Sequence, residues 1–385
     1  MDRIIFLTRS LNYGGSERQL IGLAKALWSR KTPVSVVTFY PDGSLAQDLR
    51  SVGVPLQSLD KLSRWNVAGF VVRLVKAIRQ MEPAILHGYL STANILTVLI
   101  KPFCPRVKIA WGVRASDMQL EQYGRIDQIQ SWIETLLSRF ADIIIVNSQA
   151  GLTTALRKGF PRHKMIVIPN GIDSQRFRPN PELRDKMRAQ WGVASHERVV
   201  GLVGRLDPMK GHRVFIKAAG LLAQGSPHVR FVCVGDGPEE YKRELMELSH
   251  NAHLGQRLMW VGAQDDVEAV YNALDVLASC SSYGEGFSNV IGEAMACGVA
   301  CVVTDVGDAK EIVGDTGIVV ARDDAGALVH AWLTILSRED GQRHEMSVMV
   351  RKRIVEHYSV ERLVTATITA LNTLSRGNGE EASST

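Results

Sequence analysis

The sequence predicts an α/β fold with two Rossmann-like domains, and three observations carry this prediction. Short apolar segments alternate with helical segments along the chain, which indicates parallel sheets covered by helices on both faces. The chain's 385 residues, 45% of them hydrophobic, fit a soluble globular protein but are too many for one ordinary core. Each half also begins with a buried strand, a glycine-containing turn and a helix.

The first half opens with a strand at Ile4–Thr8, a turn at 12–16 and an amphipathic helix at 17–30. In that helix Leu20 and Leu27 share one face, which is expected to cover the sheet. Further strands are expected at residues 34–39, 84–87, 108–112, 143–147 and 165–168.

The second half repeats this order, with a strand at 199–203, a glycine loop at 204–211 and a helix at 212–223. Ligands of such sheets bind beyond the carboxyl ends of the strands, where the glycines of both halves fall. Further strands are expected at residues 231–235, 258–262, 276–279, 299–304 and 317–320.

The boundary between the domains is expected within residues 169–181, a stretch that follows a strand and is rich in turn-forming residues. This gives an N-terminal domain of residues 1–170 and a C-terminal domain of residues 171–359. The Gly-, Glu- and Ser-rich tail at 376–385 is expected to be disordered.

The composition favours a cytosolic protein without a bound metal. The N-terminus lacks the apolar core of a signal peptide, and no apolar run approaches the roughly 20 residues that span a bilayer. The five cysteines form no C-x-x-C pair and have no histidines at zinc spacing, so we interpret them as small buried residues. They are Cys104, Cys233, Cys280, Cys297 and Cys301.

The net charge of +5 conceals an asymmetry between the halves. Residues 1–170 carry 22 Lys and Arg against 11 Asp and Glu, a net charge of +11, whereas the remainder carries −6. A basic half can attract an anionic membrane surface, a phosphate-bearing acceptor or nucleic acid. An ordinary solvated surface explains the same charge equally well.

Two carboxylates, Glu285 and Glu293, lie eight positions apart across a glycine-rich turn that leads into a helix. Ser288 suits the N-cap of a helix over 289–296, and Gly298 suits its end. The backbone N–H groups at such a helix start suit an anion or a sugar hydroxyl. The carboxylates can form an acid/base couple, read a polyhydroxylated anionic compound, or lie solvated on a surface helix.

The glycine loop at 204–211 carries two cations, Arg205 and Lys210, which suit a diphosphate. It is not a Walker loop, because the GK[ST] ending is absent, and Gly14-Gly15 does not give the dinucleotide fingerprint. Surface salt bridges are the alternative role for the two cations.

Together these features resemble the retaining glycosyltransferases of family 4, which have the GT-B architecture. The resemblance runs from Gly14 to about Tyr358, and its most specific parts are Gly204-Arg205-Leu206, Val234 to Pro238, and the E-x7-E segment. It implies two Rossmann-like domains that face each other across a cleft. It also implies that the last helix, at about 360–375, packs back on the N-terminal domain.

The resemblance implies roles for most of these residues. Arg205 and Lys210 would neutralise the donor diphosphate, which is where such a site gains most of its rate, so neither a metal ion nor a cofactor is expected. Glu285 would hydrogen-bond hydroxyls of the donor sugar, and Glu293 would take the ribose hydroxyls. Backbone groups would complete the donor site, and they belong to Gly14, Gly15, Gly204, Gly262, Phe287, Ser288 and Asn289.

The chain also departs from the family pattern. Many relatives carry a histidine near the strand at 109–114, where this chain has Gly112 and Arg114. Arg114 could contact the donor phosphate or an acceptor anion, or lie on the surface. His87 is a second candidate, either for the site or as a packed core histidine. Asp308 stands where relatives often have glycine, which leaves Glu311 a weaker site candidate.

The resemblance implies transfer of a sugar from a UDP- or GDP-sugar with retention, by front-face substitution. A double displacement with Glu285 as nucleophile is the alternative mechanism. The expected acceptor is a glycan or a lipid-diphosphate-linked glycan of bacterial surface polysaccharide synthesis, and no nucleic acid. The expected location is the cytoplasm or the inner face of the membrane. The competing functions are a non-catalytic GT-B scaffold and an NAD-type oxidoreductase.

Overall fold

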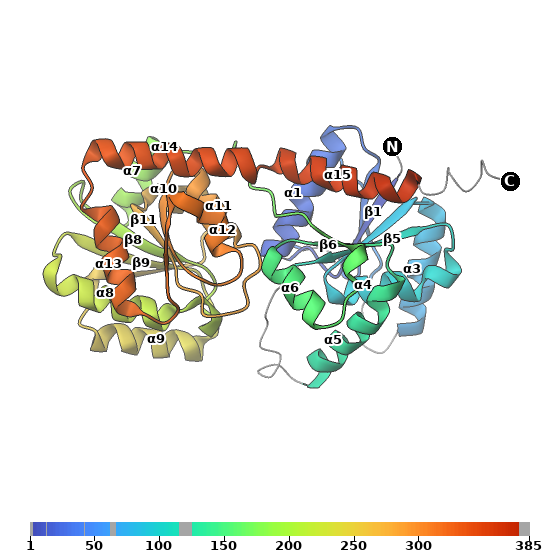
Figure 1. Cartoon of the computed structure of the whole chain (residues 1–385), viewed down its shortest axis with the longest axis horizontal. Helices are drawn as coiled ribbons and strands as arrows, with labels where there is room; N and C mark the ends of the chain where they lie inside the picture. The colour runs from blue at the N-terminus through green and yellow to red at the C-terminus, as the bar shows by residue number, and fades with distance from the viewer. Residues whose placement is uncertain (1–2, 13, 42, 62–66, 115–124, 377–385) are drawn as a thin grey trace. The chain divides into compact units, whose positions relative to one another are not determined.

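The computed structural model describes residues 3–12, 14–41, 43–61, 67–114 and 125–376. The chain divides into two compact units (Figure 1). The first comprises Met1–Gly171 together with Val360–Thr385, and the second comprises Ile172–Ser359. Apart from Arg376, the tail predicted to be disordered lies outside the described residues.

The first unit contains a seven-stranded sheet in the order β3-β2-β1-β4-β5-β6-β7. Every pairing in it is parallel, as the alternation of strands and helices predicts. One edge strand, β3, was not predicted, because it has three residues and none of them is fully buried. The strands are β1 (Ile4–Thr8), β2 (Val34–Thr38), β3 (Leu56–Ser58), β4 (Ile85–Tyr89), β5 (Lys108–Val113), β6 (Ile143–Val146) and β7 (Met165–Val167).

Helices cover both faces of this sheet. On one face α1 (Gly15–Ser29), α2 (Ala46–Arg50) and α15 (Val360–Arg376) share an apolar core with β1, and α1 and α15 lie side by side (Figure 1). Helix α1 corresponds to the helix predicted at 17–30, and it starts two residues earlier, at Gly15. The other face carries α3 (Val67–Met81), α4 (Ser91–Leu99) and α6 (Gln149–Arg157), and α5 (Arg125–Leu137) packs against α4.

The second unit contains a six-stranded parallel sheet in the order β10-β9-β8-β11-β12-β13. All of its strands were predicted from the sequence, within about two residues at each end. They are β8 (Arg198–Val203), β9 (Val229–Val234), β10 (Leu258–Gly262), β11 (Val276–Ser279), β12 (Ala300–Thr304) and β13 (Ile318–Val320). The helices are α7 (Pro181–Gln190), α8 (His212–Gly225), α9 (Glu239–Asn251), α10 (Val267–Ala273), α11 (Asn289–Ala296), α12 (Ala309–Val313), α13 (Ala325–Leu336) and α14 (Asp340–His357).

The strand order of each sheet reverses direction at one point. In the first sheet this happens between β1 and β4, and in the second between β8 and β11. Because the connections leave to opposite sides there, a crevice opens beyond the carboxyl ends of the two strands, and α/β proteins bind ligands in it. Each Rossmann-like unit has one such switch point, so functional residues are expected near these two points.

Candidate active site

The loops that follow β8 and β11 are joined at the switch point of the second sheet. Lys210 Nζ forms an ion pair with Oε1 of Glu285, and the hydroxyl of Ser281 donates to the same oxygen at 2.9 Å. The side chains of Lys210 and Glu285 are 19% and 12% exposed. The structure therefore brings together two residues that are 75 positions apart and that were predicted independently to bind a ligand.

Arg205 lies in the same loop but is oriented differently. Its guanidinium NH2 donates to Oδ2 of Asp207 at 2.9 Å, and its side chain is 68% exposed. Asp207 also caps the short 3-10 helix η5 (Pro208–Lys210), because its Oδ1 accepts from the N–H of Met209 at 3.0 Å. Thus one cation of the loop is held by a largely buried carboxylate, and the other reaches into solvent.

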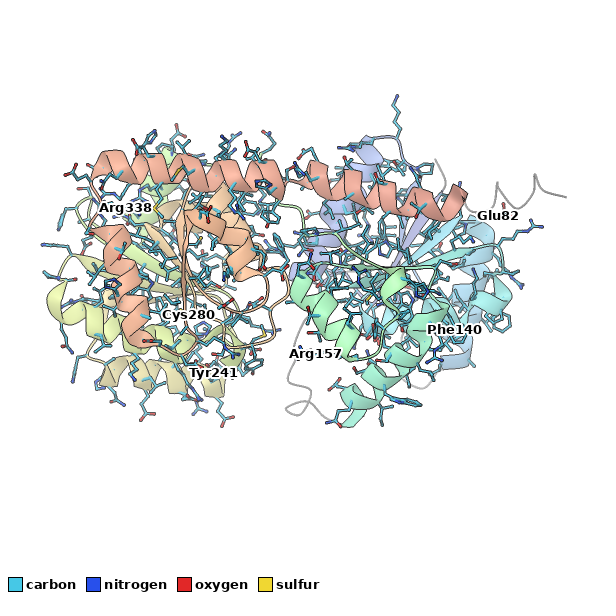
Figure 2. All side chains as sticks on the ribbon, viewed as in Figure 1. Glu82, Phe140, Arg157, Tyr241, Cys280 and Arg338 are labelled. Carbon is cyan, nitrogen blue, oxygen red and sulfur yellow. The ribbon has the colours of Figure 1, made fainter. Side chains whose placement is uncertain are left out.

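Gly211 is what allows η5 to lie against the end of β11. Its φ of +70° is in the left-handed region, which favours glycine. A Cβ atom there would also collide with the carbonyl oxygen of Cys280 (labelled in Figure 2). The chain is further fixed here by a 2.9 Å hydrogen bond from the N–H of Ser282 to the carbonyl of Met209. The position of Lys210 thus depends on a residue without a side chain.

The glycine-rich turn leads into α11 over the predicted residues 289–296. Ser288 is the N-cap residue and has extended backbone angles, but its hydroxyl makes no capping hydrogen bond. Phe287 and Ser288 are buried, whereas Asn289 is half-buried, and the ring of Phe287 packs on that of Tyr358 at 5.2 Å. The first backbone N–H groups of an α-helix have no intrahelical acceptors, so this turn presents donors beside Glu285.

Glu293 lies on α11 and is 4% exposed. The phenol of Tyr271, on α10, donates to its Oε2 at 2.8 Å. A solvated surface position for Glu285 and Glu293 is therefore wrong, since the structure buries most of both side chains. Tyr271 itself was not predicted, because nothing in the sequence links it to a carboxylate 22 residues later.

Gly204 directly follows β8 and Gly262 ends β10, so both lie at the carboxyl ends of strands in the second sheet. The N–H of Gly204 donates to the carbonyl of Val234 at 2.9 Å, and the N–H of Gly235 donates to the carbonyl of Gly262 at 2.8 Å. Apart from its chain neighbours, none of the described residues has an atom within 4 Å of the position that a Cβ of Gly262 would take. The space beside Gly262 is therefore open to a flat ligand group, and its role beside the base stays a prediction.

The loop after β12 carries Asp308, which departs from the family pattern, and Glu311, the weaker site candidate. Asp308 is buried, and its N–H donates to the carbonyl of Gly286 at 3.1 Å, so it braces the glycine-rich turn. Glu311 is exposed, and its backbone carbonyl accepts from the hydroxyl of Tyr358 at 3.1 Å.

In the first unit, Gly14 and Gly15 lie where β1 leads into α1. Gly14 is the N-cap residue, and a Cβ atom there would collide with the carboxylate of Glu17. Glu17 lies in the first turn of α1, and burial raises its pKa. The periodicity of residues 17–30 predicts only an amphipathic helix, and nothing in it indicates that the Glu17 carboxylate lies beside Gly14.

His87 and Arg114 lie near each other at the switch point of the first sheet. His87 is fully buried on β4, burial lowers its pKa to about 3, and neither ring nitrogen has a hydrogen-bond partner among the described residues. Arg114 donates to Oδ1 of Asn170 at 3.1 Å, and its guanidinium lies 4.4 Å from the ring centroid of Tyr89. A surface position for Arg114 is therefore wrong, because its side chain is 9% exposed.

The space beside Gly112 is bordered by side chains of the neighbouring strand β4. A Cβ atom at Gly112 would lie 3.3 Å from Nε2 of His87 and 3.3 Å from the Tyr89 ring. The imidazole of His87 on β4 therefore lies close beside Gly112 on β5, and a side chain at Gly112 would have to displace it slightly.

Two further observations concern metals and membranes. Within the described ranges, His, Cys, Asp and Glu side chains form no group of three or more that could hold a metal ion. Among the helices of the described residues, none combines the length and the apolar character needed to cross a bilayer. Catalysis without a metal or cofactor stays a prediction.

The two units match two models of glycosyltransferase families. The model described as "Glycosyltransferase Family 4" matches residues 13–176, and the model described as "Glycosyl transferases group 1" matches residues 197–338. The first match covers the switch point that holds His87, and the second covers the one that holds Lys210 and Glu285.

Known proteins resemble the chain over most of its length. EpsF of Bacillus subtilis (strain 168) is 24% identical over 315 residues, which cover 79% of each protein. The UDP-Gal:alpha-D-GlcNAc-diphosphoundecaprenol alpha-1,3-galactosyltransferase of Escherichia coli is 24% identical over 304 residues, or 76% of each. The crystal structure of Anabaena HepE in complex with UDP-glucose superposes with a TM-score of 0.84 at 27% identity, covering 97% of this chain and all of HepE.

The family matches and the fold agree with each other. Two parallel sheets of seven and six strands, each with helices on both faces, are the architecture shared with HepE. The protein is therefore a glycosyltransferase with the GT-B fold, similar to the surface-polysaccharide glycosyltransferases of bacteria.

Proposed function

We propose that this protein transfers a sugar from a UDP- or GDP-sugar to a glycan or lipid-diphosphate-linked acceptor, with retention of configuration and without a metal ion. The observation that carries the proposal is the Lys210–Glu285 pair at the switch point of the second sheet. A paired cation and carboxylate, mostly withdrawn from water, match the two ends of such a donor: a diphosphate and a set of hydroxyls.

Arg205 and Lys210 are proposed to neutralise the diphosphate, which carries the charge of the leaving group. The exposed guanidinium of Arg205 exchanges Asp207 for a phosphate oxygen when the donor arrives. The ammonium of Lys210 lies in a largely buried position, where its charge is weakly screened and acts strongly on a departing phosphate. Two cations supply the stabilisation for which other transferases use a divalent metal, which supports a metal-independent reaction.

The two carboxylates are proposed to read hydroxyl groups. Lys210 and Ser281 both donate to Oε1 of Glu285, and this fixes the carboxylate as an acceptor for the sugar hydroxyls. Glu293, held by the phenol of Tyr271, accepts from the ribose hydroxyls. The backbone N–H groups of Phe287, Ser288 and Asn289 bind oxygens of the donor on the same side.

Residues of the first unit are proposed to contact the sugar and the acceptor. Gly14 and Gly15 present backbone to the donor, because no side chain of their own stands in the way. His87 is neutral at physiological pH, since its pKa is about 3, so it acts as a hydrogen-bond donor or acceptor and not as a charge. Arg114 is positively charged and is the group proposed to meet an anion, either the donor phosphate or the acceptor phosphate.

The proposed chemistry is a front-face substitution. The bond between the anomeric carbon and the diphosphate oxygen breaks, and the acceptor oxygen bonds to the same face through an oxocarbenium-like state. The proton of the acceptor hydroxyl passes to the departing diphosphate oxygen, so charge and atoms balance without a protein base. Glu285 is then a positioning residue, and a double displacement that uses it as nucleophile is the competing route.

The proposed classes of donor and acceptor are inferred from related proteins. The HepE complex contains UDP-glucose, and the Escherichia coli relative is named for a UDP-galactose donor and a diphosphoundecaprenol-linked acceptor. We infer from these that a UDP-sugar is the first donor to test and a lipid-diphosphate-linked glycan the first acceptor. Such an acceptor lies in a membrane, which would make the protein peripheral on the inner face of the membrane during surface polysaccharide synthesis.

A screen of nucleotide sugars tests the proposal. Purified protein is incubated with UDP-glucose, UDP-galactose, UDP-N-acetylglucosamine or GDP-mannose in EDTA, and thermal stability and release of the nucleotide diphosphate are measured. We expect one donor to raise the melting temperature and to be slowly hydrolysed, and the Lys210→Ala variant to lose the hydrolysis. Absence of both effects for every donor would contradict the proposal.

A further inference from the structure

Helix α5 of the first unit turns its polar side toward the protein. The amide of Gln130 donates to the hydroxyl of Thr92 at 3.4 Å, and the amide of Asn94 donates to Oε1 of Glu134 at 3.1 Å. Thr92 and Asn94 belong to α4, and Glu134 is buried enough for desolvation to raise its pKa. Two side-chain hydrogen bonds therefore join α5 to α4, and Leu137 near the end of α5 packs against the apolar core of the same face.

The opposite side of α5 presents large apolar side chains to solvent. Their spacing of three or four residues places them on one face of the helix, continued by the 3-10 helix η3 (Ser138–Phe140) that ends at Phe140 (labelled in Figure 2). We name this set the α5 apolar stripe, and it consists of Ile126 (79% exposed), Ile129 (58%), Trp132 (66%), Leu136 (41%) and Phe140 (57%).

This arrangement is the reverse of an ordinary surface helix, in which the apolar face covers the core and the polar face meets water. Single exposed apolar side chains are common and carry no meaning, but five in a row along one helix form a contiguous patch. The stripe is therefore a surface that another apolar body is expected to cover.

Basic groups gather where the stripe ends. Arg139 is exposed beside Phe140, and Nζ of Lys164 donates to the backbone carbonyls of Arg139 and Ala141 at 2.6 and 2.8 Å. Lys158 is exposed and close enough to Glu134 to interact with its charge. Glu134 partly offsets Lys158, and the Asp142 carboxylate is 3.8 Å from Nζ of Lys101, so Arg139 carries the most exposed positive charge of this group.

We propose that the α5 apolar stripe docks on the surface of an anionic lipid bilayer. The helix lies flat in the interface, with Trp132 and the aliphatic side chains between the headgroups, while Arg139, Lys158 and Lys164 meet lipid phosphates. This docking does not depend on the transfer reaction proposed above, because no residue of the stripe belongs to the candidate site.

Charge favours a bilayer over a second copy of the chain. A bilayer needs no matching surface beyond the stripe, and its anionic headgroups complement the adjacent cations. A second copy of the chain would instead bring two sets of these cations together.

Flotation of the full-length protein with vesicles tests the proposal. The vesicles contain phosphatidylcholine, either alone or with about one-quarter phosphatidylglycerol. We expect binding to the anionic vesicles that weakens in about 1 M NaCl. The Ile129→Ser/Trp132→Ser variant should lose at least about tenfold in the bound fraction, because each buried CH₂ group contributes about 0.8 kcal/mol. The Arg139→Glu/Lys158→Glu variant should lose binding to anionic vesicles.

A matched control removes two exposed apolar side chains elsewhere. Val348 and Met349 on α14 are 55% and 52% exposed, and their serine variants should bind vesicles like the wild type. Donor hydrolysis and melting temperature measured in parallel separate a docking defect from a folding or catalytic one. Unaltered vesicle binding by the Ile129→Ser/Trp132→Ser variant overturns the proposal. So does a concentration-dependent dimer, seen by sedimentation, that this variant abolishes.

Discussion

The phenol of Tyr271 donates a 2.8 Å hydrogen bond to Oε2 of Glu293, so the α11 carboxylate is fixed from inside the second unit. A residue held in this way binds a ligand without first being ordered. We therefore expect Glu293→Gln to raise the Kd of the nucleotide sugar by about tenfold or more, since hydrogen bonds to charged groups contribute about 1.5–3 kcal/mol. Isothermal titration with the donor measures this.

Turnover separates binding from chemistry in the same variant. At saturating donor, kcat of Glu293→Gln should stay within a few-fold of the wild type, and Tyr271→Phe should weaken donor binding less than Glu293→Gln does. Glu356→Gln, at a position 51% exposed on α14, is the matched control. A large fall in kcat with unchanged donor affinity would show that Glu293 does not read the ribose.

Lys210→Ala should lower kcat strongly. The substitution removes the cation proposed to stabilise the leaving diphosphate, and the loss of one such group typically costs about 10²–10³ in kcat. Lys352→Ala is the control, because Lys352 is 68% exposed and pairs with Glu356 one turn along α14. Steady-state kinetics that leave Lys210→Ala within threefold of wild type would favour a non-catalytic scaffold.

Gly211→Ala should destabilise the second unit more than Gly192→Ala does. Both glycines have φ in the left-handed region, at +70° and +65°, and alanine costs about 1–2 kcal/mol there. At Gly211 the new Cβ would also collide with the Cys280 carbonyl, whereas at Gly192 it would meet no atom of the described residues within 4 Å beyond its chain neighbours. Urea unfolding of the two variants compares them, and equal losses would mean that the loop after β8 adapts freely.

Two buried histidines should make the protein less stable in mild acid. Burial lowers the pKa of His87 to about 3 and that of His212 to about 4, from a usual 6.5. Below about pH 6.5 the unfolded chain binds protons at these imidazoles and the folded chain does not, so the free energy of unfolding falls as pH falls toward 4. Each group contributes a slope of up to about 1.4 kcal/mol per pH unit.

Unfolding in urea at several pH values measures that slope. His87→Asn should reduce the slope by up to about half, because His212 still contributes, whereas replacing the exposed His330 on α13 should leave it unchanged. If His87→Asn retained the full slope, the imidazole of His87 would titrate normally in the folded protein and could not serve as a neutral hydrogen-bonding group.

The fold was largely predictable, because its signal is local. Apolar strands that alternate with helices are visible in sequence, and every strand expected at the outset is present. Strand β3 was missed because Leu56, Gln57 and Ser58 form a short edge with no fully buried side chain. The helix ends were placed within two or three residues, which is the usual uncertainty where the last turns are held by only a few hydrogen bonds.

The candidate site was predictable in its loops but not in its contacts. The glycines and charges of residues 204–211 and 284–293 lie where strands end, and parallel strands bring their ends to one edge. The hydrogen-bond partners of the two carboxylates could not be predicted. Ser281 meets Glu285 and Tyr271 meets Glu293 only once the chain has folded. The outward stripe of α5 was also missed, since apolar periodicity identifies a face without saying what covers it.

Donor binding without metal is the next expectation. A nucleotide sugar at about 100 times its Kd should stabilise the protein by roughly 2.7 kcal/mol. For a unit of this size, that corresponds to a rise of roughly 5–10 °C in Tm. Differential scanning calorimetry with UDP-glucose in EDTA measures it. A shift that appears only after Mg²⁺ or Mn²⁺ is added would contradict metal-independent binding by Arg205 and Lys210.

The anomeric configuration of the product tests the central claim most directly. With an α-linked UDP-sugar as donor, proton NMR of the first product formed distinguishes an α- from a β-glycoside by the coupling of the anomeric proton. Front-face transfer at a site built from Lys210, Glu285 and Glu293 predicts the α-product. A β-product would contradict the proposed mechanism.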